Sequence, residues 1–294
     1  MLEFLKPTLK DKQWAKPIFL SSGYMSSDNA FGTAFIWKDA YDLKICRHKD
    51  FLLRMYGDGN ITYGFPLGKG NFKDIINMLI DDAKERDEEL SFVGLTKPMV
   101  SLLYEIMPEA FIFKSTRDTA DYIYESSDLI NLKGKKYHKK RNHISKFNTT
   151  YKFEYSDINK ENIDDCRIIL KQWYNESDYK NNESLLNEKA ALELALDNFK
   201  ELEFLGGIIK VEGLPVALTM GEKINDEVFV IHFEKALKDY RSVYAIINNE
   251  FAKYNLSDYK YINREEDLGL EGLRKAKMSY YPQIILEKYN ATLR

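Results

Sequence analysis

Apolar residues recur along this chain with two different periods. Over 72–86, Ile75, Ile76, Leu79 and Ile80 fall on one face at helical spacing. Elsewhere, short runs of β-branched and aromatic residues are bounded by glycine, asparagine or aspartate, which is typical of strands. Because both periods appear in both halves of the chain, the pattern predicts a mixed α+β protein.

The first half opens with a helical stretch and continues with a series of short strands. We expect strands over 34–37, 43–46, 51–56 and 61–65, ahead of the helix over 72–86. A buried strand over 90–95 and a helix over 97–106 follow, with Pro98 in the first turn of that helix, where proline is tolerated. Two further strands are expected over 111–113 and 122–124.

The second half repeats this order. The expected elements are helices over 162–174 and 183–199, strands over 204–211, 216–223 and 228–233, a helix over 241–254, a strand over 260–263, a short helix over 270–278 and a strand over 283–289. The repeated order resembles that of a GNAT acyltransferase domain. We therefore expect two tandem GNAT-like domains, each a mixed twisted sheet flanked by helices, over 1–132 and 151–294, joined by a basic connecting helix over 133–150.

Composition agrees with two folded domains. The chain has 294 residues, of which 44% are hydrophobic and 30% charged, and its 20 Tyr and 17 Phe can fill two cores. The two cysteines exclude a disulfide framework, and the four histidines show no metal-ligand spacing, so no metal is expected. The sequence shows no signal peptide and no apolar run of about 18 residues, which predicts a soluble, cytoplasmic protein.

The net charge of −3 gives no general attraction to nucleic acid or membranes, but one segment is strongly basic. Residues 133–146 contain seven Lys and Arg residues and no acid. Lys136, Lys139, Lys140 and His143 have helical spacing, so a positive stripe could bind phosphate on RNA, on lipid headgroups or on a cofactor. The alternative is a solvated linker helix.

Three ordered blocks carry a family resemblance. The blocks read YESSDLINLKGKK (124–136) with KKRN (139–142), YRSVY (240–244) with INNEF (247–251), and INREEDLG (262–269) with GLRKAK (272–277) and SYYP (279–282). They resemble the signature of the phosphatidylglycerol lysyltransferase C-terminal domain family. The resemblance implies a tandem GNAT fold, related also to Fem-type aminoacyltransferases.

The resemblance also implies an activity. Characterised members that carry an added membrane domain pass a lysyl or alanyl group from aminoacyl-tRNA to phosphatidylglycerol. This sequence lacks that domain, so a soluble small acceptor stands beside a lipid headgroup as an expectation. The expected partner is tRNA as the aminoacyl donor, with no tightly bound cofactor. The oligomeric state is left open.

Candidate catalytic residues lie in the second half. Glu234 directly follows the strand expected over 228–233, where a carboxylate could act as a general base or bind an amine. Asn248 and Asn249 lie within an expected helix, although asparagine is a mediocre helix former, so one of them is expected to face the site. The alternatives are an exposed acid beside Lys235 and exposed asparagines.

Substrate contacts are expected after the strand over 260–263. Glu265, Glu266 and Asp267 could together bind the ammonium group of a cationic amino acid, or Glu266 or Asp267 could cap the following helix. The predicted substrate-binding residues are Asn249, Asn263, Glu265, Glu266, Asp267 and Tyr280. The predicted phosphate-binding or tRNA-binding residues, whose alternative is ordinary surface charge, are Lys136, Lys139, Lys140, Arg141, Arg274, Lys275 and Lys277.

Coenzyme A is the alternative donor. GNAT enzymes hold its pyrophosphate on a glycine-rich turn at a helix start, and residues 238–244 contain no glycine. Gly68-Lys69-Gly70 is the comparable loop, and two glycines are weak evidence. Aminoacyl transfer is therefore preferred to acyl-coenzyme A-dependent N-acylation. A GNAT-fold binding protein without catalysis is a further alternative.

Overall fold

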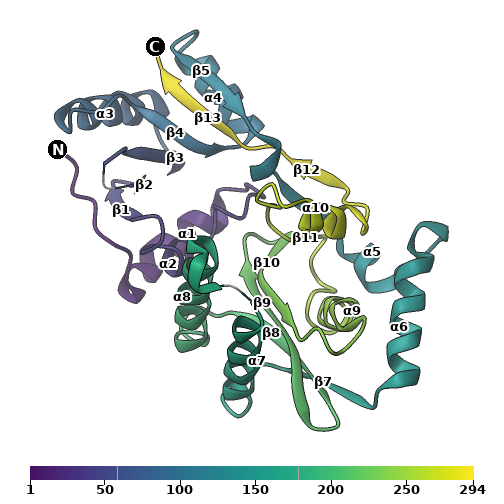
Figure 1. The fold of residues 1–294 in the computed structure, drawn as a ribbon. Helices are drawn as coiled ribbons and strands as arrows, with labels where there is room; N and C mark the ends of the chain where they lie inside the picture. The colour runs from purple at the N-terminus through teal and green to yellow at the C-terminus, as the bar shows by residue number, and fades with distance from the viewer. Residues whose placement is uncertain (58, 178) are drawn as a thin grey trace. The chain divides into compact units, whose positions relative to one another are not determined.

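The computed structural model of the chain describes residues 1–57, 59–177 and 179–294. The chain divides into two compact units, and each unit is built from segments that are not contiguous in the sequence (Figure 1). The first unit comprises Met1–Tyr122, Glu266–Arg274 and Ile285–Arg294, and the second comprises Ile123–Glu265 and Lys275–Ile284. This division differs from the expected contiguous domains, because the end of the chain returns to complete the first sheet.

The first unit contains a six-stranded sheet with the order β1-β2-β3-β4-β13-β5. The last strand of the chain, β13, pairs antiparallel with both β4 and β5, so it lies inside this sheet (Figure 1). The strands are β1 (Lys44–His48), β2 (Phe51–Tyr56), β3 (Thr62–Gly68), β4 (Ser91–Leu95), β5 (Phe111–Ser115) and β13 (Tyr289–Leu293).

Helices of the first unit follow the predicted amphipathic pattern, with one exception. In α3, Asn71 caps the first turn by accepting hydrogen bonds from the backbone N–H groups of Lys73 and Asp74. The strand expected over 34–37 is wrong: these residues belong largely to the helix α2, whose apolar side chains are buried on several sides. The helical segments are η1 (Leu9–Asp11), α1 (Lys12–Ser21), α2 (Phe31–Ile36), α3 (Phe72–Glu85), α4 (Lys97–Ile106) and η2 (Arg117–Thr119).

The seven-stranded sheet has the order β12-β6-β11-β10-β9-β8-β7. Its β10 and β11 are parallel, whereas β9 runs antiparallel to both β8 and β10. The strand expected over 283–289 is in fact two strands, β12 here and β13 in the other sheet. The members are β6 (Asp121–Glu125), β7 (Phe153–Asp157), β8 (Leu205–Val211), β9 (Leu214–Lys223), β10 (Val228–Ala236), β11 (Tyr261–Asn263) and β12 (Ile284–Leu286).

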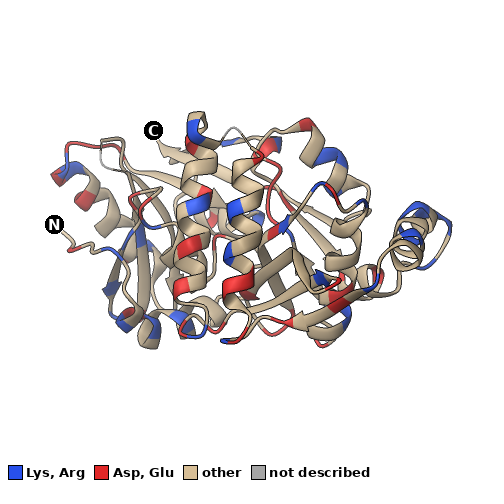
Figure 2. Cartoon of the chain, turned by 60° about the horizontal axis from the view of Figure 1, so that its bottom comes forward, with Lys and Arg blue, Asp and Glu red and all other residues tan. Residues whose placement is uncertain are grey.

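Helices of the second unit pack around this sheet. Val243, Ile246 and Ile247 of α9 are buried against Ile209 and Val216 of the strands β8 and β9. Figure 2 shows α7 and α8 side by side, each with acidic and basic residues, and Arg167 joins them by an ion pair to Asp197 at 2.7 Å. The helical segments are α5 (Ser126–Asn131), η3 (Lys135–Tyr137), α6 (His138–Thr150), α7 (Ile163–Asn175), η4 (Tyr179–Asn181), α8 (Glu183–Asp197) and α9 (Val243–Asn255), while α10 (Glu271–Met278) extends from the first unit into the second.

Candidate active site

Glu234 lies within β10, next to an irregularity in the strand. The register between β10 and β9 shifts between Ile231 and Phe233, and from there Glu234 pairs with Thr219 of β9. The expectation that Glu234 follows the strand is corrected, because β10 continues to Ala236. A β-bulge bends a strand and redirects its side chains, and such bulges are frequent beside active sites. Directly opposed residues of an antiparallel pair share one face, so Thr219 and Glu234 point to the same side.

Two side chains from other elements hold the Glu234 carboxylate. Arg264, which directly follows β11, donates from Nη2 to Glu234 Oε1 over 2.9 Å. Asn248 of α9 donates from Nδ2 to Glu234 Oε2 over 3.3 Å. Each carboxylate oxygen therefore has one partner, and the predicted pair of Glu234 and Asn248 meets in one place. We call Glu234, Arg264, Asn248 and Thr219 the Glu234 centre.

Three polar atoms of the Glu234 centre are buried without a hydrogen-bond partner among the described residues. They are Thr219 Oγ1, Asn248 Oδ1 and Arg264 Nη1. Thr219 is fully buried and Asn248 is 1% exposed. An unpaired buried polar atom costs about 1–3 kcal/mol, so natural proteins rarely keep several in one place without a reason. Two acceptor-capable oxygens and a guanidinium donor beside a carboxylate can bind a small polar group.

Aromatic rings and a further cation border the Glu234 centre. The Arg264 guanidinium lies over the rings of Tyr280 and Tyr124, at 5.0 and 5.8 Å from their centroids. The Lys140 amine of α6 lies 3.5 Å from the centroid of the Tyr280 ring. Burial, opposed by the charge of Arg264, raises the pKa of Tyr280 to about 12, so this phenol stays protonated. The predicted residues Lys140 and Tyr280 therefore belong with Glu234.

Lys277 holds the backbone of the turn that carries Arg264. Its amine donates to the carbonyl oxygens of Arg264 and Glu265, at 2.6 and 3.1 Å. Its own carbonyl accepts a hydrogen bond from the Tyr124 hydroxyl at 2.8 Å. Lys277 thus holds the backbone that carries Arg264, which is a different task from the predicted contact with phosphate.

His232, at the irregularity of β10, is enclosed by two carboxylates. Its Nδ1 lies 2.8 Å from Glu265 Oε1, and its Nε2 lies 3.1 Å from Glu222 Oε1. Burial alone would lower the pKa of His232, but hydrogen bonds to Glu222 and Glu265 raise it to about 9. The imidazolium is therefore charged at neutral pH and compensates the carboxylate of Glu222, which is 1% exposed.

The three consecutive acids predicted to bind one ammonium group each have a different cationic partner. Glu265 pairs with His232, and Glu266 lies 3.5 Å from the amine of Lys288. Asp267, which is fully buried, accepts from Arg274 Nε over 2.7 Å and from the hydroxyl of Tyr122. Asp267 Oδ1 also accepts from the Gly269 N–H, which closes a turn two residues before α10 begins at Glu271.

The two remaining predicted asparagines hold backbone. Asn249 donates from Nδ2 to the carbonyl oxygens of Leu129 and Ile130, at 2.7 and 2.9 Å, and so ties α9 to α5. Asn263 Oδ1 accepts from the N–H of Glu265 at 2.7 Å. Glu265 has a φ of 57°, a left-handed conformation that this side-chain contact stabilises.

The predicted basic residues separate into paired and exposed groups. Lys136 pairs with Asp128 at 3.1 Å, Arg274 pairs with Asp267 and Asp118, and Arg141 donates to the carbonyl oxygens of Leu132 and Gly134. Lys139 and Lys275 are exposed, and among the described residues neither has an ion-pair partner, so both are open to a phosphate group.

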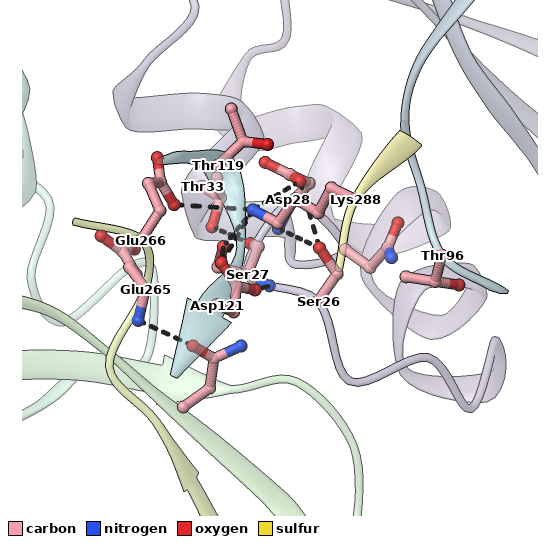
Figure 3. Close-up of polar contacts among 12 residues, drawn as sticks. Ser26, Ser27, Asp28, Thr33, Thr96, Thr119, Asp121, Glu265, Glu266 and Lys288 are labelled. Carbon is pink, nitrogen blue, oxygen red and sulfur yellow. Dashed lines mark hydrogen bonds and ion pairs between the residues drawn. The ribbon is translucent and has the colours of Figure 1, made fainter. Parts of the chain in front are cut away.

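A second cluster of charged residues lies within the first unit, around the buried Lys288 (Figure 3). Its amine lies 2.8 Å from Asp121 Oδ1, 2.9 Å from Asp28 Oδ2 and 3.2 Å from Ser27 Oγ. Burial lowers the pKa of Lys288, but Asp121, Asp28 and Glu266 outweigh that effect and hold it well above the ordinary value. We call these five residues the Lys288 cluster.

The start of α9, where a GNAT enzyme would bind pyrophosphate, is built from larger residues. Ser242 occupies the position before the helix with a φ of 74° and makes no side-chain capping bond. The Tyr240 ring packs on the ring of Tyr151 at 5.5 Å. Side chains therefore fill the space that glycine leaves open to a phosphate group.

The sequence pattern did not predict Arg264, Thr219, Glu222 or His232 as site residues. Arg264 stands inside the third block that carries the family resemblance, between the predicted residues Asn263 and Glu265, and this position was the available signal. Among the described residues, no three or more His, Cys, Asp and Glu side chains gather as a metal site, and no helix is both long and apolar enough to span a bilayer.

Comparisons with known proteins identify a family and several proteins of similar sequence or fold. The model of the family "Phosphatidylglycerol lysyltransferase, C-terminal" matches residues 22–292. A conserved protein of unknown function from Bacteroides thetaiotaomicron has a solved structure that is 41% identical, with 100% of both chains covered and a TM-score of 0.96. An uncharacterised protein of Mycoplasmoides gallisepticum is 24% identical over 177 residues, and the match spans about half of that relative's length, 55%.

More distant structures show the fold. L-PGS from Bacillus licheniformis is 16% identical, with 94% of this chain and 90% of that chain covered and a TM-score of 0.68. FemX is 9% identical (100% and 98% covered, TM-score 0.64), and a tandem GNAT protein from the clavulanic acid pathway is 8% identical (99% and 98% covered, TM-score 0.51). The expected tandem GNAT-like fold is confirmed, and family and fold together support a transferase. The chain belongs to the phosphatidylglycerol lysyltransferase C-terminal domain family.

Proposed function

We propose that this protein transfers an aminoacyl group from aminoacyl-tRNA to an amine or hydroxyl group, either on a lipid headgroup or on a small soluble acceptor. The Glu234 centre is the proposed site of this reaction. The observation that carries the proposal is the set of three buried, unpaired polar atoms around Glu234. A bound aminoacyl ester would supply partners for them.

The reaction makes and breaks one bond at the carbonyl carbon. The acceptor nitrogen or oxygen attacks this carbon, the ester C–O bond breaks, and the ribose 3′ oxygen leaves with a proton. Arg264 Nη1 can donate to the carbonyl oxygen as it gains negative charge, which is the usual role of such a donor. Glu234, together with Asn248 Oδ1, can accept hydrogen bonds from the α-ammonium of the aminoacyl group.

Family membership favours aminoacyl-tRNA as the donor, and the start of α9 disfavours coenzyme A. That turn has no glycine, and Tyr240 packs there on Tyr151. The exposed Lys139 and Lys275 are proposed contacts for the tRNA phosphates. A cationic amino acid held by Glu265, Glu266 and Asp267 is not part of the proposal, since each of these acids has its own cation.

A transfer assay with single charged tRNAs tests the proposal. The purified protein is mixed with tRNA carrying one radiolabelled amino acid, in the presence of phosphatidylglycerol vesicles or a panel of soluble amines. We expect label to leave tRNA and appear in the acceptor fraction. Glu234→Gln should lower the rate about 10²-fold, because the aminoacyl group is no longer held in its reacting position.

Glu212→Gln, a change at an exposed turn, is the matched control and should leave the rate unchanged. Equal rates for Glu234→Gln and the wild type would place the reaction elsewhere. Transfer from acetyl-coenzyme A, with none from any charged tRNA, would reverse the choice of donor.

A further inference from the structure

Lys140 differs from the other cations of the basic segment in its surroundings. Its amine is half-buried and lies 3.5 Å above the centroid of the Tyr280 ring. Within the described parts of the chain, no carboxylate forms a salt bridge with it, whereas Lys136 on the same segment pairs with Asp128. An aromatic face attracts a cation only weakly compared with a carboxylate, so burial here disfavours the charged amine.

The charged groups that face Lys140 strengthen this effect. The Arg264 guanidinium lies over the same Tyr280 ring and repels a second cation, while Glu234 on β10 opposes the repulsion. On α6 itself, the next turn carries His143, whose pKa is lowered by burial, by Lys140 and by Arg241. Burial and the Arg264 charge together lower the pKa of the Lys140 amine to about 8, so it can gain and lose a proton near neutral pH.

We propose that Lys140 carries the proton in the transfer reaction. The neutral amine takes the proton of the acceptor nitrogen or oxygen as the new bond to the carbonyl carbon forms. The resulting ammonium group gives that proton to the ribose 3′ oxygen as the ester C–O bond breaks, which restores the amine. The proposal rests on the function proposed above and adds a catalytic residue from a different element, the basic helix α6.

This role also divides the basic segment by function. Lys139, the preceding residue, is exposed and free to meet phosphate, while Lys140 turns towards the Glu234 centre. Both carboxylate oxygens of Glu234 accept hydrogen bonds, from Arg264 and from Asn248. In the proposed reaction a different residue, Lys140, therefore acts as the base. General bases work best when they titrate near the working pH, which fits an amine in this setting.

The first test needs no substrate. The wild-type protein is acetylated with trace acetic anhydride at several values of pH, and peptide mass spectrometry reads the extent of modification of each lysine. We expect reaction at Lys140 to rise with a midpoint near pH 8, well below the ordinary value of 10.5 for a lysine amine. Glu234→Gln should move the Lys140 midpoint lower still, because it removes a negative charge that raises the pKa of Lys140. A Lys140 midpoint at the ordinary value of 10.5 overturns the proposal.

The second test uses Lys140→Arg, which keeps the charge but cannot release a proton, and Lys140→Met. Both should lower the transfer rate about 100-fold or more while tRNA affinity in filter binding changes less than about 3-fold for Lys140→Arg. The wild-type rate should rise as pH passes through about 8, and the rate of Lys140→Met should not. Lys146→Arg is the control for a change on the same helix.

The outcomes separate the two proposals. If wild-type protein transfers label and Lys140→Arg does so equally well, Lys140 is not the proton carrier and the proposed function stands. If wild-type protein transfers label from no charged tRNA, the proposed function fails and this role fails with it, whatever the labelling shows.

Discussion

The Glu234 centre and the Lys288 cluster are both buried groups of charged residues, yet they differ in how completely their atoms are paired. In the Lys288 cluster, Asp121 accepts from the Ser27 N–H and hydroxyl as well as from Lys288. In the Glu234 centre, three buried polar atoms lack a partner among the described residues. The Lys288 amine is thus paired within its own cluster, whereas the Glu234 centre keeps the open polar atoms on which the proposed function depends.

Electrostatics explains why these two arrangements should behave differently on mutation. Removing one partner from a closed buried cluster leaves an uncompensated charge in a poorly solvating interior. An open cluster already bears the cost of unpaired atoms, so changing one of them costs less stability and more function. Mutations can therefore test the comparison directly.

The largest expected effect on stability is at Lys288. Lys288→Met leaves Asp28, Asp121 and Glu266 without their shared cation, so we expect a loss of about 3–5 kcal/mol in the free energy of unfolding. Urea denaturation followed by circular dichroism measures it. Lys275→Met, at an exposed lysine, is the control and should change stability by less than about 0.5 kcal/mol. Equal stabilities of the two variants would show that the Lys288 cluster is not a closed structural unit.

His232 should make stability depend on pH. Its pKa is raised from the ordinary 6.5 to about 9 by Glu222 and Glu265 against the effect of burial. The stabilisation is thus fully present below pH 6.5 and is lost as the pH rises through about 9, by about 3 kcal/mol over that window. Urea denaturation at pH 6 and pH 9 measures it. His232→Gln should remove most of this slope, and the exposed His138→Gln should not; a wild-type stability that is flat across this window contradicts the assignment.

Substitutions of the two neighbouring asparagines, Asn248 and Asn249, are expected to give the smallest losses of stability. Asn249→Ala removes both hydrogen bonds to α5 and should cost about 1–3 kcal/mol, while transfer by the folded fraction is kept. Asn248→Ala removes one long bond and an unpaired oxygen, so it should cost less than about 1 kcal/mol but lower the transfer rate. Thermal melts and the transfer assay are run on both. The reverse ranking would mean that Asn248 is structural and Asn249 lies in the site.

Much of the local structure could be predicted because it depends on local periodicity. The helices α3 and α4 and the strand β2 lie within a residue of their expected ranges. Glu234 and Asn248 were predicted from their positions near the end of a strand and within a helix, and they do contact one another. The helix α2 was missed, because six apolar and small residues fit a buried strand or a buried helix equally well.

Contacts between distant segments could not be predicted in the same way. Arg264 reaches Glu234 because β11 lies parallel to β10, although 30 residues separate the two side chains. Lys288 meets Asp28 and Asp121 only because the chain returns to the first unit at its end. Three adjacent acids, Glu265 to Asp267, looked like one site, but the turn there directs them to three different cations.

By itself, the sequence determined most of the helices and strands, the repeated GNAT-like plan, the family and the basic character of the segment over 133–146. These features depend on residue types and on spacings of a few positions, both of which can be read directly from the sequence. Only the tertiary structure decided which charges are paired, that Thr219, Asn248 and Arg264 keep unpaired atoms, and that Lys140 lies on Tyr280. Pairing and burial depend on distances between segments far apart in sequence, and those distances exist only after the chain has folded.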